Sequence, residues 1–310
     1  MKVLVTGGSG FVGEHLVTKL LKRNHEVIVG YRTKYLNDSF NSIRIDITSK
    51  DSIKKALQKI KPDVIFHLAA QSSVPNSWKY PAETVNTNTI GTINLVQMVG
   101  EVVPDSKIIT VGSSEEYGLS AMHNEIINES VICNPQNPYA SSKMLGCQIA
   151  FQFAKKENLK LIHLRPFNHF GPGQKKGFVV SDFASQIAEI EAGLIEPEIN
   201  VGDLSSFRDF TDVRDIVEAY VLLIESDIES GIFNISSGIP IEIKSILNIL
   251  ISLSNKKIKI KKDEKKIRPS NIKKFAGDSS KLKIQTGWSQ KYNLNESLED
   301  TLNWWRSQVN

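Results

Sequence analysis

Short apolar runs alternate with stretches of helical spacing through the first half of the chain. Val3–Val5 is such a run, and Phe11, Leu16 and Leu20 follow it near the spacing of one helical face. The predicted strands are Val3–Val5, Glu26–Val29, Ser42–Ile47, Val64–Leu68, Lys107–Val111 and Lys160–Leu164, and the predicted helices between them are Gly10–Arg23, Lys50–Ile60, Glu83–Val99 and Tyr139–Lys155. This alternation predicts an α/β fold, a doubly wound parallel sheet covered by helices on both faces.

The rhythm changes after Arg165, where the Pro- and Gly-rich stretch RPFNHFGPGQ begins. Beyond it, the spacing predicts helices at Val180–Glu191, Val213–Ile224, Ile243–Ile251 and Leu294–Gln308, and a strand at Gly231–Ile235. Helix 213–224 and strand 231–235 are typical of a return to the main sheet. We therefore predict a larger sheet domain from residues 1–166 plus about 208–236, and a smaller C-terminal α/β domain from residues 167–207 plus about 237–310.

The composition is that of a globular protein. Hydrophobic residues make up 40% of the 310 and charged residues 23%, which excludes a disordered chain, a coiled coil and a collagen-like repeat. The two cysteines, Cys133 and Cys147, are too few for a disulfide framework or a four-thiolate zinc site, and they fit a reducing cytosol. Apolar runs are shorter than the roughly 18 residues of a membrane span, and the five-residue apolar burst within the first ten residues is too short for a signal peptide. We expect a cytoplasmic protein with no membrane partner.

The net charge of +4 is uneven, because residues 256–274 hold ten Lys and Arg and only two acids. A basic block can be a nucleic-acid or phosphate patch. Here Ile258 and Ile260 alternate with lysines, which favours the solvated face of a strand. We therefore expect no nucleic-acid partner, and treat Arg268 separately.

A glycine triplet, Gly7-x-x-Gly10-x-x-Gly13, lies between the first predicted strand and helix. Glycines at this spacing let the chain turn sharply, let the backbone approach a pyrophosphate and let the helix pack close to the sheet. The phosphates then meet free N–H groups at the positive end of the helix dipole. The motif predicts a Rossmann-type dinucleotide site with cofactor contacts at Gly7, Gly10, Phe11, Val12 and Gly13.

The end of the second predicted strand indicates which dinucleotide binds. An acid there would accept from the 2′-hydroxyl of NAD, whereas an arginine suits the 2′-phosphate of NADP. The chain has Gly30-Tyr31-Arg32 and no acid, so we expect NADP(H) to be preferred, with NAD(H) as the alternative. Asp46, followed by Ile47, is placed to accept from the adenine amino group; the other interpretation is an ordinary turn or helix-cap acid.

Tyr139 and Lys143 are one turn apart in a predicted helix and so share a face. A lysine ammonium beside a phenol stabilises the phenolate and can hold the nicotinamide ribose, which makes Tyr139 a tunable acid or base. Ser113 follows the fifth predicted strand, and its hydroxyl can hydrogen-bond a substrate carbonyl or alkoxide. The pattern predicts a redox site for carbonyls and alcohols; the alternative is a pair on a helix surface.

These residues give the sequence a resemblance to the extended short-chain dehydrogenase/reductase family. The motifs that carry it are Thr6-Gly7-x-x-Gly10-Phe11-x-Gly13, His67-Leu68-Ala69-Ala70, Asn88-x-x-Gly91-Thr92, Ser113-Ser114-Glu115-Glu116-Tyr117-Gly118 and Tyr139-x-x-x-Lys143. The resemblance implies a catalytic triad of Ser113, Tyr139 and Lys143. It also implies cofactor contacts at Leu68, Ala69 and Ala70, and that Asn88 supports the lysine through water.

The second half looks like the GDP-sugar branch of that family, most similar to the GDP-4-dehydro-6-deoxy-D-mannose reductases. Its motifs are residues 165–174, Gly177-Phe178-Val179 and residues 201–215. The resemblance implies that a GDP-linked sugar contacts Ser114, Asn168, Phe178, Val179, Arg208 and Arg268. Guanidinium forks suit a diphosphate. The alternatives are surface arginines at 208 and 268 and a turn residue at Asn168.

The implied reaction is NADPH-dependent reduction of a C4 keto group in a GDP-4-keto-6-deoxy sugar, giving GDP-D-rhamnose or a related GDP-deoxysugar. Glu115 leaves an alternative open, since a Glu at the matching position of the GDP-mannose 4,6-dehydratases removes the C5 proton. A dehydratase, 4-dehydrogenase or epimerase that recycles its cofactor is therefore the second interpretation, with hexose and heptose substrates both open. A non-catalytic NADP(H) sensor is a third. The resemblance also implies a homodimer whose four-helix interface uses helices 83–99 and 139–155.

Overall fold

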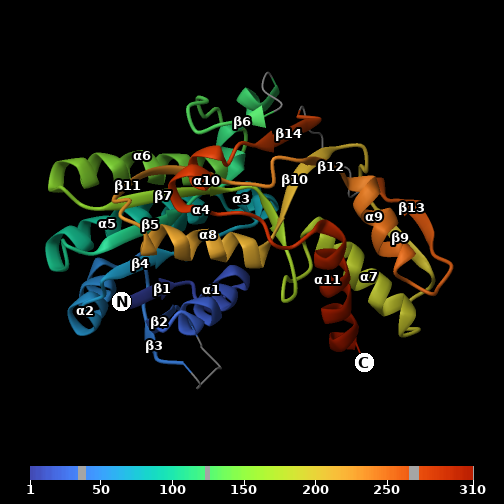
Figure 1. Ribbon diagram of the computed structural model, residues 1–310, viewed down its shortest axis with the longest axis horizontal. Coiled ribbons are helices and arrows are strands. Elements are labelled where there is room, and N and C mark those ends of the chain that lie inside the picture. Colours follow the sequence, from blue (N-terminus) through green and yellow to red (C-terminus); the bar gives the residue numbers. More distant parts are fainter. Residues whose placement is uncertain (34–39, 123–125, 265–271, 310) are drawn as a thin grey trace.

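The computed structural model describes residues 1–33, 40–122, 126–264 and 272–309. Its larger part is a parallel sheet in the order β11-β7-β5-β4-β1-β2-β3 (Figure 1). The strands are β1 Lys2–Thr6, β2 Glu26–Tyr31, β3 Ser42–Arg44, β4 Val64–His67, β5 Lys107–Val111, β7 Leu161–Pro166 and β11 Ser230–Ile235. The predicted doubly wound parallel sheet is thus confirmed, and its strand order reverses between β1 and β4.

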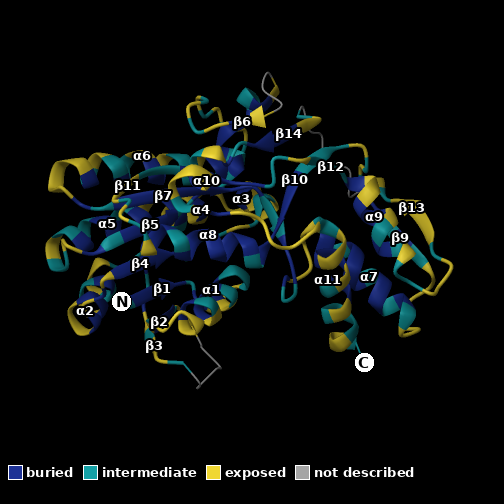
Figure 2. Cartoon of the chain, viewed as in Figure 1, coloured by how far each residue is buried: buried dark blue, intermediate teal, exposed yellow. Residues whose placement is uncertain are grey.

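Alternating strand residues pack against helices on opposite faces of this sheet. Val3 and Val5 join one buried cluster with residues of α1 and α8, whereas Leu4 joins a second cluster with residues of α2, α5 and α6. The helices are α1 Phe11–Lys22, α2 Lys50–Ile60, α5 Gly91–Val102, α6 Pro138–Glu157 and α8 Val213–Glu225. Figure 2 shows the strands buried between helices whose outward faces are exposed. Burial on both faces explains why these strands are nearly continuous apolar runs.

The predicted helix Glu83–Val99 is interrupted. The chain forms α3 Val74–Lys79 and α4 Pro81–Val85, then a π-helical turn at Asn86–Ile90, and only then α5. Short π-turns inside helices are uncommon and are frequent at functional sites. This turn carries Asn88, one of the predicted site residues.

The smaller part contains two further sheets. One has the order β12-β10-β14-β6 with β8 also paired to β10, and the other pairs β13 with β9. These strands are β6 Ile126–Ile127, β8 Asn168–Phe170, β9 Glu198–Val201, β10 Phe207–Asp212, β12 Pro240–Glu242, β13 Lys259–Lys262 and β14 Lys274–Gly277. The remaining helices are α7 Val179–Glu191, α9 Ile243–Ser252, α10 Ser280–Thr286 and α11 Leu294–Val309. α7, α9 and α11 share one buried apolar cluster.

Several strand predictions differ from the structure. The strand expected over Ser42–Ile47 ends at Arg44, and β10 was not predicted. The basic strand is present as β13, and all four of its residues are exposed, as a solvated face requires. β10 pairs within the second sheet, whereas β11 closes one edge of the first; the domain boundaries themselves stay a prediction. Within the described ranges, no helix combines the length and apolar character needed to cross a bilayer.

Candidate active site

Ser113, Tyr139 and Lys143 meet at the carboxyl end of β5. Asn137 caps α6 by accepting from the amide of Ala140 at 2.8 Å, so Tyr139 lies in the first turn of the helix. The Ser113 side chain lies close enough to the phenol of Tyr139 to lower the pKa of that phenol. The Nζ atom of Lys143 donates to the carbonyl oxygen of Val111 at 2.8 Å.

Burial dominates the electrostatics of this cluster. Tyr139 is only 9% exposed, and burial raises the pKa of its phenol although the Ser113 side chain opposes the rise. Burial also lowers the pKa of Lys143 to about 8, against the attraction of the Glu116 carboxylate. A protonated phenol beside a hydroxyl and a tunable amine can deliver a proton to a substrate oxygen.

The glycine turn lies beside the end of β4, where the strand order reverses. Gly7 has φ of +71°, and a Cβ built on it would lie 2.7 Å from the amide nitrogen of Ala69. Gly10 is the N-cap of α1, and because glycine has no side chain it leaves the first N–H groups, at Phe11 and Val12, to a ligand. Gly13 packs directly against the backbone of Gly7. The turn therefore packs directly against the backbone that follows β4, at Leu68 and Ala69.

Two arginines lie at the ends of β2 and β3. Arg32 is exposed after β2, and Nε of Arg44, which ends β3, donates to the Arg32 carbonyl at 3.2 Å. Asp46 accepts from the Thr48 hydroxyl at 2.7 Å and from its amide at 2.9 Å. These bonds, aided by Arg32 and Arg44, outweigh burial and hold the pKa of Asp46 below its usual value. Asp46 thus closes a turn, and Ile47 behind it is buried against Gly91.

Asn88 connects the end of β4 to α6. Its Oδ1 accepts from the Gln71 amide at 2.8 Å, and its Nδ2 donates to the Gln71 carbonyl and to the Ser142 hydroxyl, each at 3.0 Å. Ser142 directly precedes Lys143. Asn88 therefore links the backbone at Gln71, after β4, to α6 at the residue before Lys143.

The predicted substrate residues come from both parts of the molecule. Ser114 and Glu115 lie in the 3₁₀ turn after β5, and Asn137 donates to Glu115 at 3.1 Å. Arg208 lies on β10, with its guanidinium 5.7 Å from the centre of the Phe275 ring. Burial lowers the pKa of Arg208, and the Glu115 and Asp203 carboxylates counter this; its guanidinium donates to the Phe207 carbonyl at 2.7 Å. Asn168 pairs with Phe210 of β10.

Phe178 and Val179 begin α7. Phe178 is its N-cap and is 45% exposed, whereas Val179 packs against the apolar cluster of α7, α9 and α11. Arg268 lies outside the described residues.

A family model described as GDP-mannose 4,6 dehydratase matches residues 4–301. The chain is 31% identical over 309 residues to GDP-6-deoxy-D-mannose reductase of Pseudomonas aeruginosa, covering 99% of this chain and 98% of that protein. It is 31% identical over 283 residues to GDP-6-deoxy-D-talose 4-dehydrogenase of Aggregatibacter actinomycetemcomitans, covering 91% and 90%. The solved structure of RMD from Pseudomonas aeruginosa complexed with NADPH matches with a TM-score of 0.87 at 31% identity, covering 99% of both chains.

The chain belongs to the GDP-mannose 4,6 dehydratase family. It is an NAD(P)-dependent oxidoreductase of the extended short-chain dehydrogenase/reductase type, as the sequence motifs predicted.

In this family member, the glycine turn also contacts the Pro- and Gly-rich loop of the second half. The rings of Phe11 and His169 stack with centroids 6.2 Å apart and planes 3° apart. His15 Nε2 hydrogen-bonds the Pro172 carbonyl at 2.8 Å. Sequence reasoning missed these contacts, because a stack between residues so far apart has no local signal.

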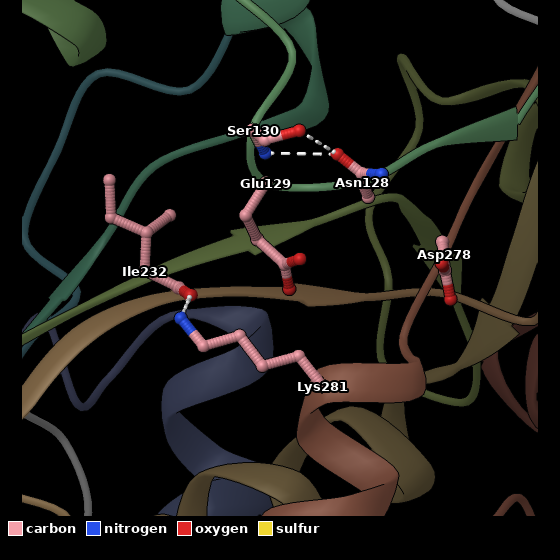
Figure 3. A pocket seen from close by; sticks show the side chains of 6 residues that line it. All are labelled: Asn128, Glu129, Ser130, Ile232, Asp278 and Lys281. Atoms are coloured by element: carbon pink, nitrogen blue, oxygen red, sulfur yellow. Dashed lines mark hydrogen bonds between the residues drawn. The ribbon is translucent and has the colours of Figure 1, made fainter.

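A groove elsewhere on this oxidoreductase is a protected sheet edge (Figure 3). Glu129 accepts from the Asn234 amide at 2.8 Å, and Lys281 donates to the Ile232 carbonyl at 2.7 Å. Both backbone groups belong to β11, the edge strand of the large sheet. Charged side chains that occupy such groups prevent edge-to-edge association. We therefore attribute the residues that line this groove to protection of the β11 edge.

Proposed function

We propose that this protein reduces the C4 keto group of a GDP-4-keto-6-deoxy sugar with NADPH. The observation that carries the proposal is the cluster at the carboxyl end of β5, where Tyr139 is buried and Ser113 and Lys143 are half-buried. The names of two relatives, a GDP-6-deoxy-D-mannose reductase and a GDP-6-deoxy-D-talose 4-dehydrogenase, support a reaction at C4 of a GDP-deoxysugar. The product is GDP-D-rhamnose or a related GDP-deoxysugar.

In the mechanism, bound NADPH supplies the hydride that C4 receives. Tyr139 donates its phenolic proton to the C4 oxygen as that oxygen gains negative charge. The Ser113 hydroxyl, which lies beside the phenol, hydrogen-bonds the same oxygen and orients it. The Lys143 ammonium lies one turn away, stabilises the phenolate that remains and holds the nicotinamide ribose.

The preference for NADPH rests on Arg32 together with Arg44. Both side chains are exposed, and the Arg44 guanidinium lies against the Arg32 backbone carbonyl, so each arginine can reach a 2′-phosphate, which NAD lacks. A relative solved with NADPH supports this assignment. NAD(H) remains usable, because the contacts at the glycine turn are the same for both dinucleotides.

GDP recognition is assigned to the second part of the molecule. The Arg208 guanidinium can bind the diphosphate, and Asn168 is paired to the same strand, β10. Phe178 and Val179, at the start of α7, are proposed as further contacts on the resemblance. Ser114 contacts the sugar from the 3₁₀ turn after β5. Arg268 is proposed as a second diphosphate ligand on the resemblance alone.

Glu115 favours one competing function. Its carboxylate is held by Asn137 at the start of α6, near the triad, where it could remove a proton from C5. An elimination needs such a base, and a plain reduction does not. The second candidate is therefore a dehydratase, 4-dehydrogenase or epimerase.

One assay separates these functions. Purified protein should oxidise one NADPH for each GDP-4-keto-6-deoxymannose that it reduces. The loss of NADPH absorbance measures this reaction. A dehydratase or epimerase would show no net NADPH loss, and a dehydratase would consume GDP-mannose itself. Binding of NADPH without turnover of either sugar would identify a sensor and overturn the proposal.

We also propose a cytoplasmic homodimer. Val85, Ile90 and Leu145 are exposed apolar residues, 38%, 41% and 42% accessible, on α4, the π-turn and α6. These are the helices of the expected four-helix interface, and a second copy would bury them. Leu145→Glu should convert the dimer into a monomer in light scattering; an unchanged mass for this variant, or a monomeric parent protein, would contradict the interface.

The proposed cytoplasmic location rests on the cysteines. Cys133 and Cys147 are free thiols, in keeping with a reducing compartment.

A further inference from the structure

A buried group of charges lies behind Ser113, and the proposed reaction does not use it. Glu116, in the turn after β5, is fully buried, and His163 and Arg165, on β7, are 2% and 5% exposed. Carboxylates and guanidinium groups are rarely buried this deeply unless they are paired. Their position next to the triad requires an explanation.

The Glu116 carboxylate joins β7 to the backbone of Ser113. Its Oε1 accepts from the Ser113 amide at 2.9 Å and from His163 Nε2 at 3.2 Å, and its Oε2 accepts from Arg165 Nε at 2.9 Å. Burial alone would raise the pKa of Glu116, but His163 and Arg165 hold it below its usual value. The Glu116 carboxylate is therefore an anion that accepts from three N–H donors.

Both cations of this group are themselves fixed. His163 Nδ1 lies 2.9 Å from the Thr110 hydroxyl, which can donate onward to the Ile162 carbonyl at 3.4 Å. Burial disfavours the imidazolium, but the neighbouring Cys147 and Glu116 raise the pKa of His163 to about 9. Arg165 also donates to the Tyr117 hydroxyl at 3.2 Å. The carboxylate is therefore held from two sides by groups with little freedom to move.

The backbone that Glu116 holds is fixed at each residue. Lys143 donates to the Val111 carbonyl, the Gly112 amide donates to Leu164 at 2.8 Å, and the Ser113 amide donates to Glu116. A Cβ built on Gly112 would overlap the Glu116 carboxylate and the His163 ring. The hydrogen bond from Glu116 and the close packing at Gly112 therefore fix the position of the Ser113 backbone.

We propose that Glu116 is a positioning residue: clamped between His163 and Arg165, it holds the Ser113 amide and thereby places the Ser113 hydroxyl against the substrate oxygen. The inference rests on the proposed function for the identity of that oxygen. It requires that Glu116 act through Ser113, whereas a merely structural role would lower activity independently of Ser113.

A double-mutant cycle tests this requirement. Glu116→Asp keeps the charge that His163 and Arg165 need but removes one methylene, and Glu116→Gln keeps the length but removes the charge. Each variant should lower the single-turnover rate by about tenfold or more, because small misplacements of reacting groups carry large rate penalties. In a Ser113→Ala background the same changes should cost less than about twofold, and NADPH affinity should stay unchanged in every variant.

Glu129→Asp is the matched control, because Glu129 also holds a backbone amide but does so at the β11 edge. It should leave the rate unchanged. An equal loss with and without Ser113, or full activity in both Glu116 variants, would overturn the proposal. If either Glu116→Asp or Glu116→Gln does not fold, the remaining variant is used to compare the rate loss with and without Ser113.

A second measurement does not depend on the substrate. In the free protein, the Ser113 amide should exchange its hydrogen about tenfold faster in Glu116→Asp than in the parent, since its acceptor has withdrawn. Unchanged exchange would exclude the clamp even if the sugar assignment is correct. If the Ser113 amide exchanges faster in Glu116→Asp but the parent protein oxidises no NADPH, the clamp exists and the proposed function is wrong.

Discussion

The two ends of the proposed cofactor site are built in opposite ways. At the reacting end Tyr139 is buried, and burial shifts the pKa values of both Tyr139 and Lys143. At the adenosine end Arg32 and Arg44 are exposed to solvent. Electrostatic interactions are strong where water is excluded and screened where it is not. Changes at the buried end should therefore stop the chemistry, whereas changes at the exposed end should adjust which dinucleotide binds.

The largest effect is expected for Tyr139→Phe. Loss of the phenolic proton removes the general acid while the ring still fills its buried place, so kcat should fall by about a thousandfold. NADPH binding, measured by fluorescence titration, should change little. Tyr292→Phe is the control, since it removes a phenol that lies against the Arg214 guanidinium, outside the proposed site. A Tyr139→Phe variant with near-normal kcat would show that another group supplies the proton.

Lys143→Met should have the next largest effect, a loss of about a hundredfold in kcat together with a changed pH profile. Burial lowers the pKa of Lys143 to about 8, so the amine is charged below that pH and loses its proton as the pH rises through it. The parent's activity should accordingly fall above pH 8, and this limb should be missing from the Lys143→Met profile.

Lys107→Met is the matched control for this profile. Lys107 begins β5, whereas Lys143 of α6 donates to Val111 at the other end of that strand. Lys107 donates to the Ser226 carbonyl at 2.9 Å, and burial lowers its pKa too. Its replacement should preserve the alkaline limb. A limb that persists without Lys143, or disappears without Lys107, would mean that a different group titrates.

The contrast between local and long-range signals explains how much of this molecule the sequence could predict. Units such as β1, the glycine turn and α1 follow from local periodicity, so the large sheet was predictable. In the second part the helices α7, α9 and α11 were predicted as well. Its main sheet was not, because β6 and β8 have only two and three residues and exist through pairing with β14 and β10. A strand that short has no periodicity of its own.

The same distinction applies to the site. Tyr139 and Lys143 share a helix face, and their spacing was sufficient to pair them. Glu116 appeared only as part of a motif, because its partners His163 and Arg165 come from β7. Arg44 was also missed; its position two residues before Asp46, near the predicted strand end, was the available signal.

Arg44→Ala should have the smallest effect and should act on cofactor choice. Removing a guanidinium that we propose as a ligand of the 2′-phosphate should weaken NADPH binding by about tenfold, the size expected for one charge-assisted hydrogen bond at an exposed site. NADH affinity should stay the same, because NADH has no phosphate there. Titrating both dinucleotides against one preparation gives the ratio directly. Arg23→Ala is the control, since Arg23 pairs with Glu218 and Glu225 at the far end of α1. Equal weakening of both dinucleotides by Arg44→Ala would mean that the arginine supports the fold of the turn around Asp46, and that the exposed end does not select NADP.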